Sequence, residues 1–342
     1  MTLKDIAAEA GVSISTVSRV INNTDTKAAS PQVRERIWEI VRRTGYIPNH
    51  SAQTLKLGHY EPPVTNRSLS CLYARTPDAP DNPFFQTIAK SAEVEAYRQD
   101  YFLKSSLTPF NVNNEETYRL IQRDTNGVVV LGRCDKPTLK FLKQYCHNVI
   151  YTGLNPLDAK YDQVLCDGYE ATLLALDYLR ALGHHHIGYV GEIEEENRYR
   201  AYCDFMKTST VSFDPSYRVA SPLTSSGGYD GAIQLLRQQQ NLTAIFCGDD
   251  IAAVGVLRAV RDFGLRVPED ISVISIDDIE TSQYLSPMLT TVHVPMEEMG
   301  TVAAKILIDR INGGHTLPMQ IKLPFYLAKR ESCAPPRKIA IT

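Results

Sequence analysis

The sequence predicts an α/β protein with an N-terminal helix-turn-helix headpiece and a larger core of two parallel-sheet lobes. Three observations support this: a positively charged front segment with helical periodicity, apolar runs that alternate with amphipathic segments from residue 68 onward, and a length of 342 residues. A single typical domain is shorter, and 43% hydrophobic residues can supply more than one core.

Charge is distributed unevenly along the chain. Residues 1–59 hold eight Lys and Arg against five Asp and Glu, a net charge of +3, which leaves −6 for the rest of a chain whose total is −3. The front segment is therefore a candidate for binding a polyanion, although a solvated surface would have the same composition. No run of about 18 apolar residues and no secretory signal is found, so we expect a cytoplasmic protein without membrane contact.

Two helices of the headpiece are marked by their ends. Thr2 can cap a first helix that Gly11 ends, and Ser30 with Pro31 can start a further helix that Gly45 ends. The apolar positions repeat at helical spacing, as Leu3, Ile6, Ala7 and Ala10 in the first helix and Val33, Ile37, Ile40 and Val41 in the other.

Between them, Ser13 can cap a second helix over residues 14–21. Val17, Val20 and Ile21 would face inward, while Ser15, Thr16, Ser18, Arg19 and Asn22 would remain on the other side. Such a helix can enter a DNA major groove about 12 Å wide, with its first turn at the base edges. A purely structural pair of helices has the same periodicity, so spacing alone leaves both interpretations open.

The identity of the residues favours the DNA-binding interpretation over a purely structural pair of helices. The segments 2–7, 10–13, 16–22 and 46–49 closely resemble the start of regulators of the lactose/galactose-repressor family. The resemblance implies that Ile14 and Ser15 read bases in double-stranded operator DNA and that Arg19 contacts a base or a phosphate. It also implies a set of backbone-contacting residues, namely Leu3, Ser13, Thr16, Ser18, Asn22, Thr26 and Asn49, and we add Tyr46 and Gln53 to the expected DNA-binding residues.

The next segment, residues 49–57, is similar to the hinge helix of that family, with Leu55 as an apolar wedge that kinks the duplex. We expect a headpiece at 1–57, a linker at 58–67, one lobe from 68–166 and 296–325, and the other from 167–295 and 326–342. The expected strands of the core are 69–73, 127–131, 148–151, 186–190, 243–247 and 271–276, and the expected helices are 85–99, 171–182 and 251–263.

The core also resembles periplasmic sugar-binding proteins, and a binding site is expected where parallel strands end. Two expected strands are followed by paired carboxylates, Asp249-Asp250 and Asp277-Asp278. Carboxylates accept hydrogen bonds from neighbouring hydroxyls and a guanidinium donates two, which suits a sugar. We expect ligand contacts from Asp249, Asp277 and Arg198, with stacking by Phe84, Tyr73 or Tyr202, whereas Asp250 is interpreted as a helix cap.

The resemblance implies pocket positions at Arg198, Asp249, Asp277 and Met296. The negative charge of Asp249 favours a neutral sugar unless Arg198 or Arg75 compensates for it. The segments 276–281 and 198–202 are similar to galactoside-responsive members, so galactose or a galactoside is the favoured effector.

Several alternatives remain at this stage. Paired carboxylates also occur in glycosidases and in divalent-metal sites, and His184-His185-His186 could bind a metal, although a turn explains it better. The seven scattered cysteines show no Cys-x-x-Cys spacing, and the common catalytic motifs are absent. We therefore expect no enzyme, no metal and no cofactor.

The favoured function is a homodimeric repressor of a sugar-utilisation operon. A dimer is expected because one headpiece makes too few base contacts, and the segment after Arg330 has no leucine heptads for a tetramer. The alternatives are a cytosolic sugar-binding module and a regulator that responds to a purine or a sugar phosphate.

Overall fold

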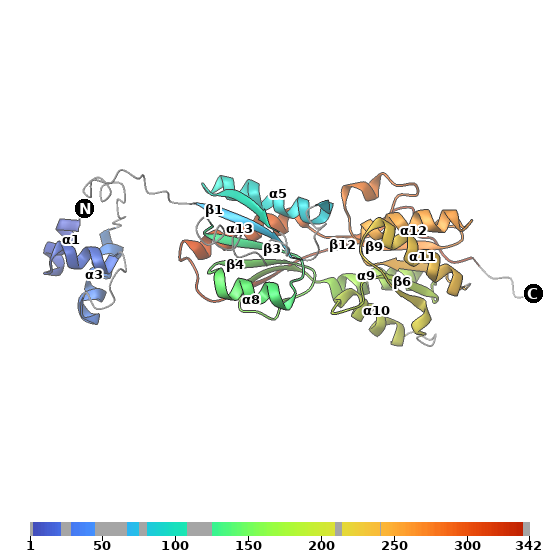
Figure 1. The fold of residues 1–342 in the computed structure, drawn as a ribbon, viewed down its shortest axis with the longest axis horizontal. Helices are drawn as coiled ribbons and strands as arrows, with labels where there is room; N and C mark the ends of the chain where they lie inside the picture. Colours follow the sequence, from blue (N-terminus) through green and yellow to red (C-terminus); the bar gives the residue numbers. More distant parts are fainter. Residues whose placement is uncertain are drawn as a thin grey trace, which may run out of the picture. The chain divides into compact units, whose positions relative to one another are not determined.

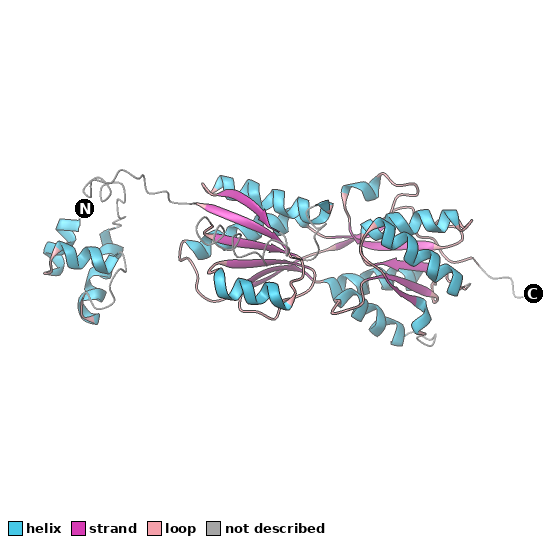
Figure 2. Cartoon of the chain, viewed as in Figure 1, coloured by secondary structure: helices cyan, strands magenta, loops and turns pink. Residues whose placement is uncertain are grey.

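The computed structural model describes residues 3–21, 29–44, 67–74, 81–107, 125–208, 214–239 and 241–337, without the side chains of residues 42, 44, 105 and 145. The chain splits into two compact units, Met1–Thr65 and Asn66–Thr342. The described part of the first unit is helical, and the second unit mixes helices with strands (Figure 2).

The headpiece contains the three expected helices, α1 (Leu3–Ala10), α2 (Ile14–Ile21) and α3 (Pro31–Thr44). They enclose a small core in which Ile6, Val17 and Ile37 are fully buried. Gly11 ends α1 at a φ of 68°, a conformation in which glycine has no steric penalty, and the amide of Val12 then donates to the carbonyl of Ala7 at 3.0 Å. The expected caps Thr2 and Gly45 lie outside the described residues.

The first half of the core is a parallel sheet with the strand order β11-β5-β4-β3-β1-β2. Its strands are β1 (Ser68–Tyr73), β2 (Phe102–Leu107), β3 (Gly127–Leu131), β4 (Val149–Gly153), β5 (Asp162–Cys166) and β11 (Gln320–Leu323). Its helices are α5 (Pro83–Arg98), α8 (Lys136–Tyr145) and α13 (Met296–Ile311). Helices α5 and α13 cover one face of the sheet and α8 covers the other (Figure 1).

The second sheet has the order β12-β10-β9-β8-β6-β7, in which only β12 runs antiparallel among the described strands. Its strands are β6 (Ile187–Gly191), β7 (Arg218–Ala220), β8 (Ala244–Cys247), β9 (Ser272–Asp277), β10 (Thr290–His293) and β12 (Tyr326–Ala328). The helices of this half are α9 (Gly168–Leu182), α10 (Asn197–Thr208), α11 (Ser225–Gln238), α12 (Asp250–Asp262) and the short 3₁₀ turns η2 (Pro215–Tyr217) and η3 (Glu280–Gln283). Helices α9 and α10 cover one face, and α11 and α12 cover the other.

The chain passes from one sheet to the other after β5, after β10 and after β11. Each sheet is therefore assembled from segments that are far apart in the sequence. The two parallel sheets, with helices on both faces, confirm the predicted fold class.

Some elements were not among those expected from the sequence. The strands β2, β7 and β11 lie at or near a sheet edge and carry polar residues, so they lack the continuous apolar run that marks a central strand. The helices α8, α10, α11 and α13 were not anticipated either. None of the helices that the structure describes is long and apolar enough to span a membrane.

Candidate functional site

Helix α2 presents an exposed N-terminal turn on the headpiece. The hydroxyl of Ser13 accepts a hydrogen bond from the amide of Thr16 at 3.1 Å, so Ser13 caps the helix as expected. The hydroxyls of Ser15 and Thr16 each lie 2.8 Å from that of Ser13. Ile14, the first residue of the helix, leaves 48% of its surface exposed.

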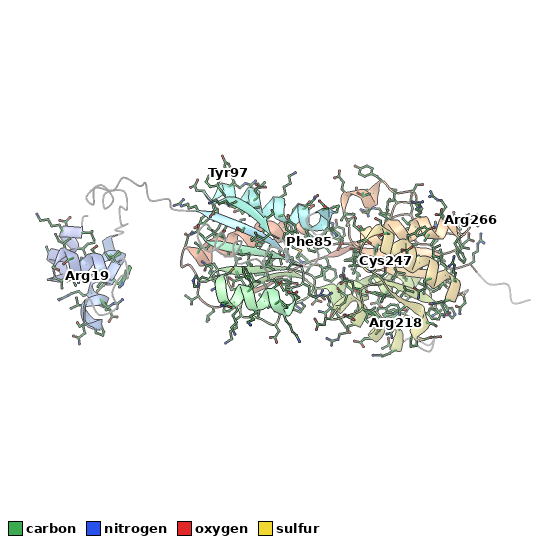
Figure 3. All side chains as sticks on the ribbon, in the orientation of Figure 1. Arg19, Phe85, Tyr97, Arg218, Cys247 and Arg266 are labelled. Carbon is green, nitrogen blue, oxygen red and sulfur yellow. The ribbon has the colours of Figure 1, made fainter. Side chains whose placement is uncertain are left out.

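The remaining predicted DNA-binding residues differ in their exposure to solvent, and several lie outside the described residues. Arg19 is exposed on the same helix, and Figure 3 labels it, whereas Ser18 is half-buried. Leu3 packs against the headpiece core and is only half-exposed. Several predicted positions lie outside the described residues, namely Asn22, Thr26, Tyr46, Asn49, Gln53, Leu55 and the whole hinge segment 49–57.

A cavity lies in the core unit at the carboxyl ends of strands from both sheets. The empty space between its side chains, including the part open to solvent, is about 410 Å³. Its lining consists of Asn82, Phe84, Phe85, Gly132, Arg133, Tyr151, Gly153, Leu154, Asn155, Arg198, Asp249 and Asp277. Phe84 and Phe85 are arranged edge to face, with ring centroids 5.2 Å apart.

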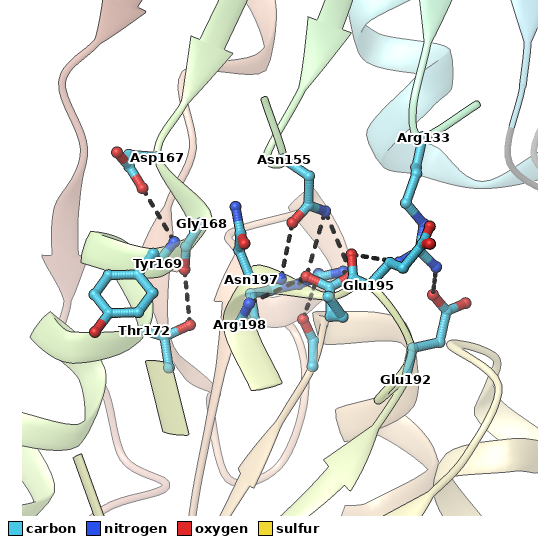
Figure 4. A network of polar contacts seen from close by, with 12 residues as sticks. Arg133, Asn155, Asp167, Gly168, Tyr169, Thr172, Glu192, Glu195, Asn197 and Arg198 are labelled. Atoms are coloured by element: carbon cyan, nitrogen blue, oxygen red, sulfur yellow. Dashed lines mark hydrogen bonds and ion pairs between the residues drawn. The ribbon is translucent and has the colours of Figure 1, made fainter. Parts of the chain in front are cut away.

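Arg198 is the buried cation of this cavity. Its Nε and Nη2 donate to the two carboxylate oxygens of Glu196 at 2.8 and 2.9 Å, and its Nη1 donates to the carbonyl of Gly248 at 2.6 Å (Figure 4). Burial alone would lower the pKa of Arg198, but the charge and hydrogen bonds of Glu196, together with the charge of Asp277, raise it. The guanidinium is therefore charged at any physiological pH.

The two predicted carboxylates are both buried beside it. Asp249 follows β8 and caps α12, because its carboxylate accepts a hydrogen bond from the amide of Ala252 at 2.7 Å. Asp277 ends β9 with a φ of 130°, a left-handed conformation that side chains rarely adopt and that is found mainly at functional sites.

Asp250 has a different role from the one predicted. It is the first residue of α12 rather than its cap, and it is fully buried. Its carboxylate accepts hydrogen bonds from Ser275 Oγ at 2.5 Å, Thr291 Oγ1 at 2.6 Å and the amide of Ile279 at 2.9 Å. The interpretation of Asp250 as the helix cap was therefore wrong, because Asp249 has that position and Asp250 ties α12 to β9 and β10.

Side chains from the first half of the core reach across to the second half. Arg133, which follows β3, donates through Nη1 to the carbonyls of Glu194 at 2.5 Å and Glu195 at 2.8 Å. Its Nη2 donates to the Glu192 carboxylate at 2.8 Å. Asn155, which follows β4, accepts from the amide of Asn197 at 2.9 Å (Figure 4). These contacts hold the two halves together around the cavity.

Three predicted ligand residues do not line the cavity. Tyr202 is fully buried beneath β6, where its hydroxyl donates to the carbonyl of Ile187 at 2.8 Å and its ring lies against Tyr189. Tyr73 and Met296 are 5% and 4% exposed and pack in the same apolar core. Tyr202, Tyr73 and Met296 therefore pack in the apolar core and do not line the cavity, contrary to the prediction from the sequence. Arg75 lies outside the described residues.

The cavity also contains residues that the sequence analysis did not select, namely Asn82, Phe85, Arg133, Tyr151 and Asn155. Arg133 and Asn155 each follow a strand, so the rule that identified Asp249 could have found them as well. Glu196, the partner of Arg198, had no comparable signal, because it belongs to an acidic run that resembles an ordinary surface loop.

The histidine run does not gather metal ligands. His184 contacts Thr243 Oγ1 at 3.0 Å and the carbonyl of Ala334 at 2.9 Å, and burial lowers its pKa. His186 contacts the hydroxyl of Tyr217 at 2.9 Å. In the described part of the chain, no three His, Cys, Asp or Glu side chains are grouped so that they could hold a metal.

Comparison with protein families gives two matches. A model described as bacterial regulatory proteins, lacI family, matches residues 2–49, and a model of a periplasmic binding protein-like domain matches residues 176–333.

Whole-length relatives are found as well. The chain is 30% identical over 342 residues to the HTH-type transcriptional repressor PurR of Escherichia coli, with 97% of each chain covered. It is 29% identical over 342 residues to the HTH-type transcriptional repressor MelR of Bacillus subtilis, again with 97% of each chain covered.

Solved structures have the same fold. A complex of the transcriptional regulator CelR with cellobiose has a TM-score of 0.71 and 25% identity, and the match covers 97% of this chain and 99% of that one. A lac repressor dimer bound to operator has a TM-score of 0.66 and 22% identity, with 98% and 99% covered.

Proposed function

Because this chain belongs to the lacI family of bacterial regulatory proteins, we propose that it is an operator-binding repressor whose core responds to a small neutral sugar. Galactose or a galactoside is the first candidate, and genes of sugar utilisation are the expected targets. The observation that carries the effector proposal is the cavity at the strand ends, where Asp249, Asp277 and Phe84 lie together.

The chemistry of the cavity suits a polyhydroxyl ligand. Carboxylates accept hydrogen bonds from sugar hydroxyls, and the rings of Phe84 and Phe85 offer apolar surface to a sugar face. The CelR relative is a cellobiose complex, which supports a neutral sugar as the ligand class. The choice of galactose or a galactoside among the neutral sugars rests on the sequence segments 198–202 and 276–281.

For the DNA-binding function, we assign base reading to Ile14 and Ser15. An apolar side chain and a short hydroxyl at the start of a helix can contact a thymine methyl group and a base edge. The capped N-terminus of α2 offers backbone amides to a phosphate. Arg19 would contact a base or the backbone from the same exposed side.

We further propose a homodimer as the DNA-binding species. Two headpieces on a two-fold axis would read two half-sites of a pseudo-palindromic operator, which multiplies the discrimination of one headpiece. The effector would act by its differential affinity for two arrangements of the core, as in any two-state equilibrium.

The test of the effector proposal is a thermal-shift scan of the full chain against neutral sugars, sugar phosphates and purines. A ligand that binds only the native state raises the melting temperature, and galactose or a galactoside should do so. The variant Asp277→Asn should lose this response. A response to purines or sugar phosphates alone would contradict the neutral-sugar proposal.

The DNA function is tested separately, by selecting bound duplexes from a random-sequence pool. We expect enrichment of one pseudo-palindromic sequence, and the same sequence should be enriched by Asp277→Asn. Recovery of no preferred sequence would contradict the proposed operator binding without bearing on the cavity.

A further inference from the structure

Arg198 and Glu196 form a buried ion pair at the cavity, with two parallel hydrogen bonds between them. The side chains of Arg198 and Glu196 expose 2% and 1% of their surfaces. Glu196 accepts two parallel hydrogen bonds from Nε and Nη2 of Arg198, at 2.8 and 2.9 Å. This is the edge of a guanidinium that binds a carboxylate or a phosphate in a bidentate manner. In this chain, the edge is already occupied by a carboxylate of the protein.

Glu196 is also held from the other side. Its Oε1 accepts from the backbone amide of Arg198 at 3.2 Å, and Nδ2 of Asn155 lies 3.3 and 3.4 Å from its two oxygens (Figure 4). A buried carboxylate with this many donors is stabilised where it stands, and breaking such a pair leaves an uncompensated charge. An anionic ligand would therefore have to displace Glu196 at a large cost.

The other charges around the cavity act in the same direction. Arg133 is bound to the carboxylate of Glu192, so its charge is also compensated by the protein. The carboxylates of Asp249 and Asp277 line the cavity as well. An incoming anion would meet two further negative charges, whereas hydroxyl groups could donate to them.

We propose that Glu196 is a specificity-determining residue, an internal counter-ion that fills the anion-binding edge of Arg198 and restricts the cavity to uncharged ligands. The inference rests on the proposed function, since it takes the cavity to be the effector site. It adds that one glutamate decides between neutral and anionic effectors. When the charge of Glu196 is removed, the free edge of Arg198 becomes a binding site for an oxyanion.

The test uses inorganic phosphate as the probe and the full chain as the protein. Glu196→Gln keeps the size of the side chain and removes its charge. Its melting temperature should lie below that of the wild type, and phosphate should raise it by at least about 3 °C relative to chloride at equal ionic strength. The wild type should show a smaller difference between phosphate and chloride, which arises from the general stabilising effect of phosphate and from its binding to the headpiece.

Two control variants locate the effect. Glu194→Gln removes the same charge from an exposed position of the same loop, and it should behave as the wild type. The double variant Glu196→Gln with Arg198→Gln removes both charges of the pair, so it should respond to phosphate no more than the wild type does. A Glu196→Gln protein that responds to phosphate no more than Glu194→Gln would overturn the proposal.

A wild-type measurement keeps the proposal testable if Glu196→Gln does not fold. Stabilisation of the wild type by phosphate that Arg198→Gln abolishes would mean that the arginine edge accepts anions despite Glu196, and the proposal would be wrong. The phosphate experiments do not involve DNA or a sugar. A wild type without any sugar response would therefore refute the sugar assignment while the phosphate result is judged separately.

Discussion

At the residue scale, neighbouring side chains in this protein have opposite environments. Asp249 lines the cavity and caps α12, whereas Asp250 points into the protein and receives hydrogen bonds from two hydroxyls and an amide. Complete burial raises the pKa of Asp250 to about 7, although its hydrogen bonds oppose the shift. This carboxyl is therefore only weakly acidic in the folded state.

The raised pKa predicts a pH dependence of stability. In the unfolded chain Asp250 loses its proton near pH 4, but in the folded chain it holds the proton until about pH 7. Stability conferred by this group is thus fully present below about pH 4 and is lost as the pH rises toward 7. The variant Asp250→Asn cannot ionise, so its melting temperature should fall less between pH 5 and pH 8, by several degrees.

The comparison is of slopes, because Asp250→Asn replaces one of the two acceptor oxygens by an NH2 group that cannot accept a hydrogen bond, so the variant should melt lower at every pH. Asp158→Asn is the control, since Asp158 is exposed and the slope should follow the wild type. Parallel melting curves for Asp250→Asn and the wild type across this range would show that Asp250 is ionised in the fold at low pH.

A second prediction at this scale concerns Ile14 and Ser15. Exchanging the two residues should change which duplex is preferred, because each position meets a different base edge, and a base contact is worth about 1–3 kcal/mol of discrimination. The measurement is affinity for the selected duplex and for duplexes mutated at single positions. Glu35→Gln, an exposed change on α3, should leave the preference as it is. An unchanged preference after the exchange would refute the base-reading assignment.

At the element scale, close helix contacts depend on missing side chains. A Cβ added at Gly300 of α13 would lie 2.1 Å from the carbonyl of Ile88 in α5. Likewise, a Cβ at Gly255 of α12 would lie 1.9 Å from the carbonyl of Ser225 in α11. Both contacts are with backbone atoms, which cannot move aside as a side chain can. The glycines therefore set the distance between the paired helices on each sheet.

This packing reverses the usual effect of a helix substitution. Alanine in place of glycine normally stabilises a helix, but Gly300→Ala should destabilise the core by about 1–3 kcal/mol because α5 and α13 must separate. Chemical unfolding of the variant measures the effect, with Lys305→Ala on the exposed side of α13 as the control. A Gly300→Ala protein as stable as Lys305→Ala would mean that the helices are not in such close contact.

At the scale of the whole core, the two halves are joined by polar contacts around the cavity. Arg133 makes three hydrogen bonds to the loop that follows β6, and its side chain is only about one quarter exposed. Contacts of this kind favour the arrangement in which the halves approach each other. An effector bound between the halves would then further stabilise the closed arrangement, which the hydrogen bonds of Arg133 already favour.

Removing these bonds should shift the core toward an open arrangement. For Arg133→Met without ligand, we expect small-angle scattering of the full chain to give a larger radius of gyration than that of the wild type. We also expect an effector affinity about 5- to 30-fold weaker, because the competent state is less populated. Lys136→Met makes the same change of charge at an exposed site nearby and should alter neither quantity. Scattering profiles that coincide for wild type and Arg133→Met would contradict the bridging role.

The sequence by itself determined features that depend on local periodicity and on strand ends. The three headpiece helices, the alternation that predicts parallel sheets, and the position of Asp249 and Asp277 after two strands follow from spacing along the chain. These patterns are visible because burial repeats every two residues in a strand and every 3.6 in a helix. The expectation that Arg198 lies near Asp249 and Asp277 came from the family resemblance.

Only the tertiary structure decided where particular side chains point and which distant residues they meet. It placed Tyr202 beneath β6, gave Asp249 the helix-capping role that was expected of Asp250, and brought Arg133 and Asn155 to the loop that contains Glu196. The contacts of Arg133 and Asn155 join segments that are 41 or more residues apart and that belong to different halves of the core. Their contact depends on how the two halves pack, which no local pattern in the sequence encodes.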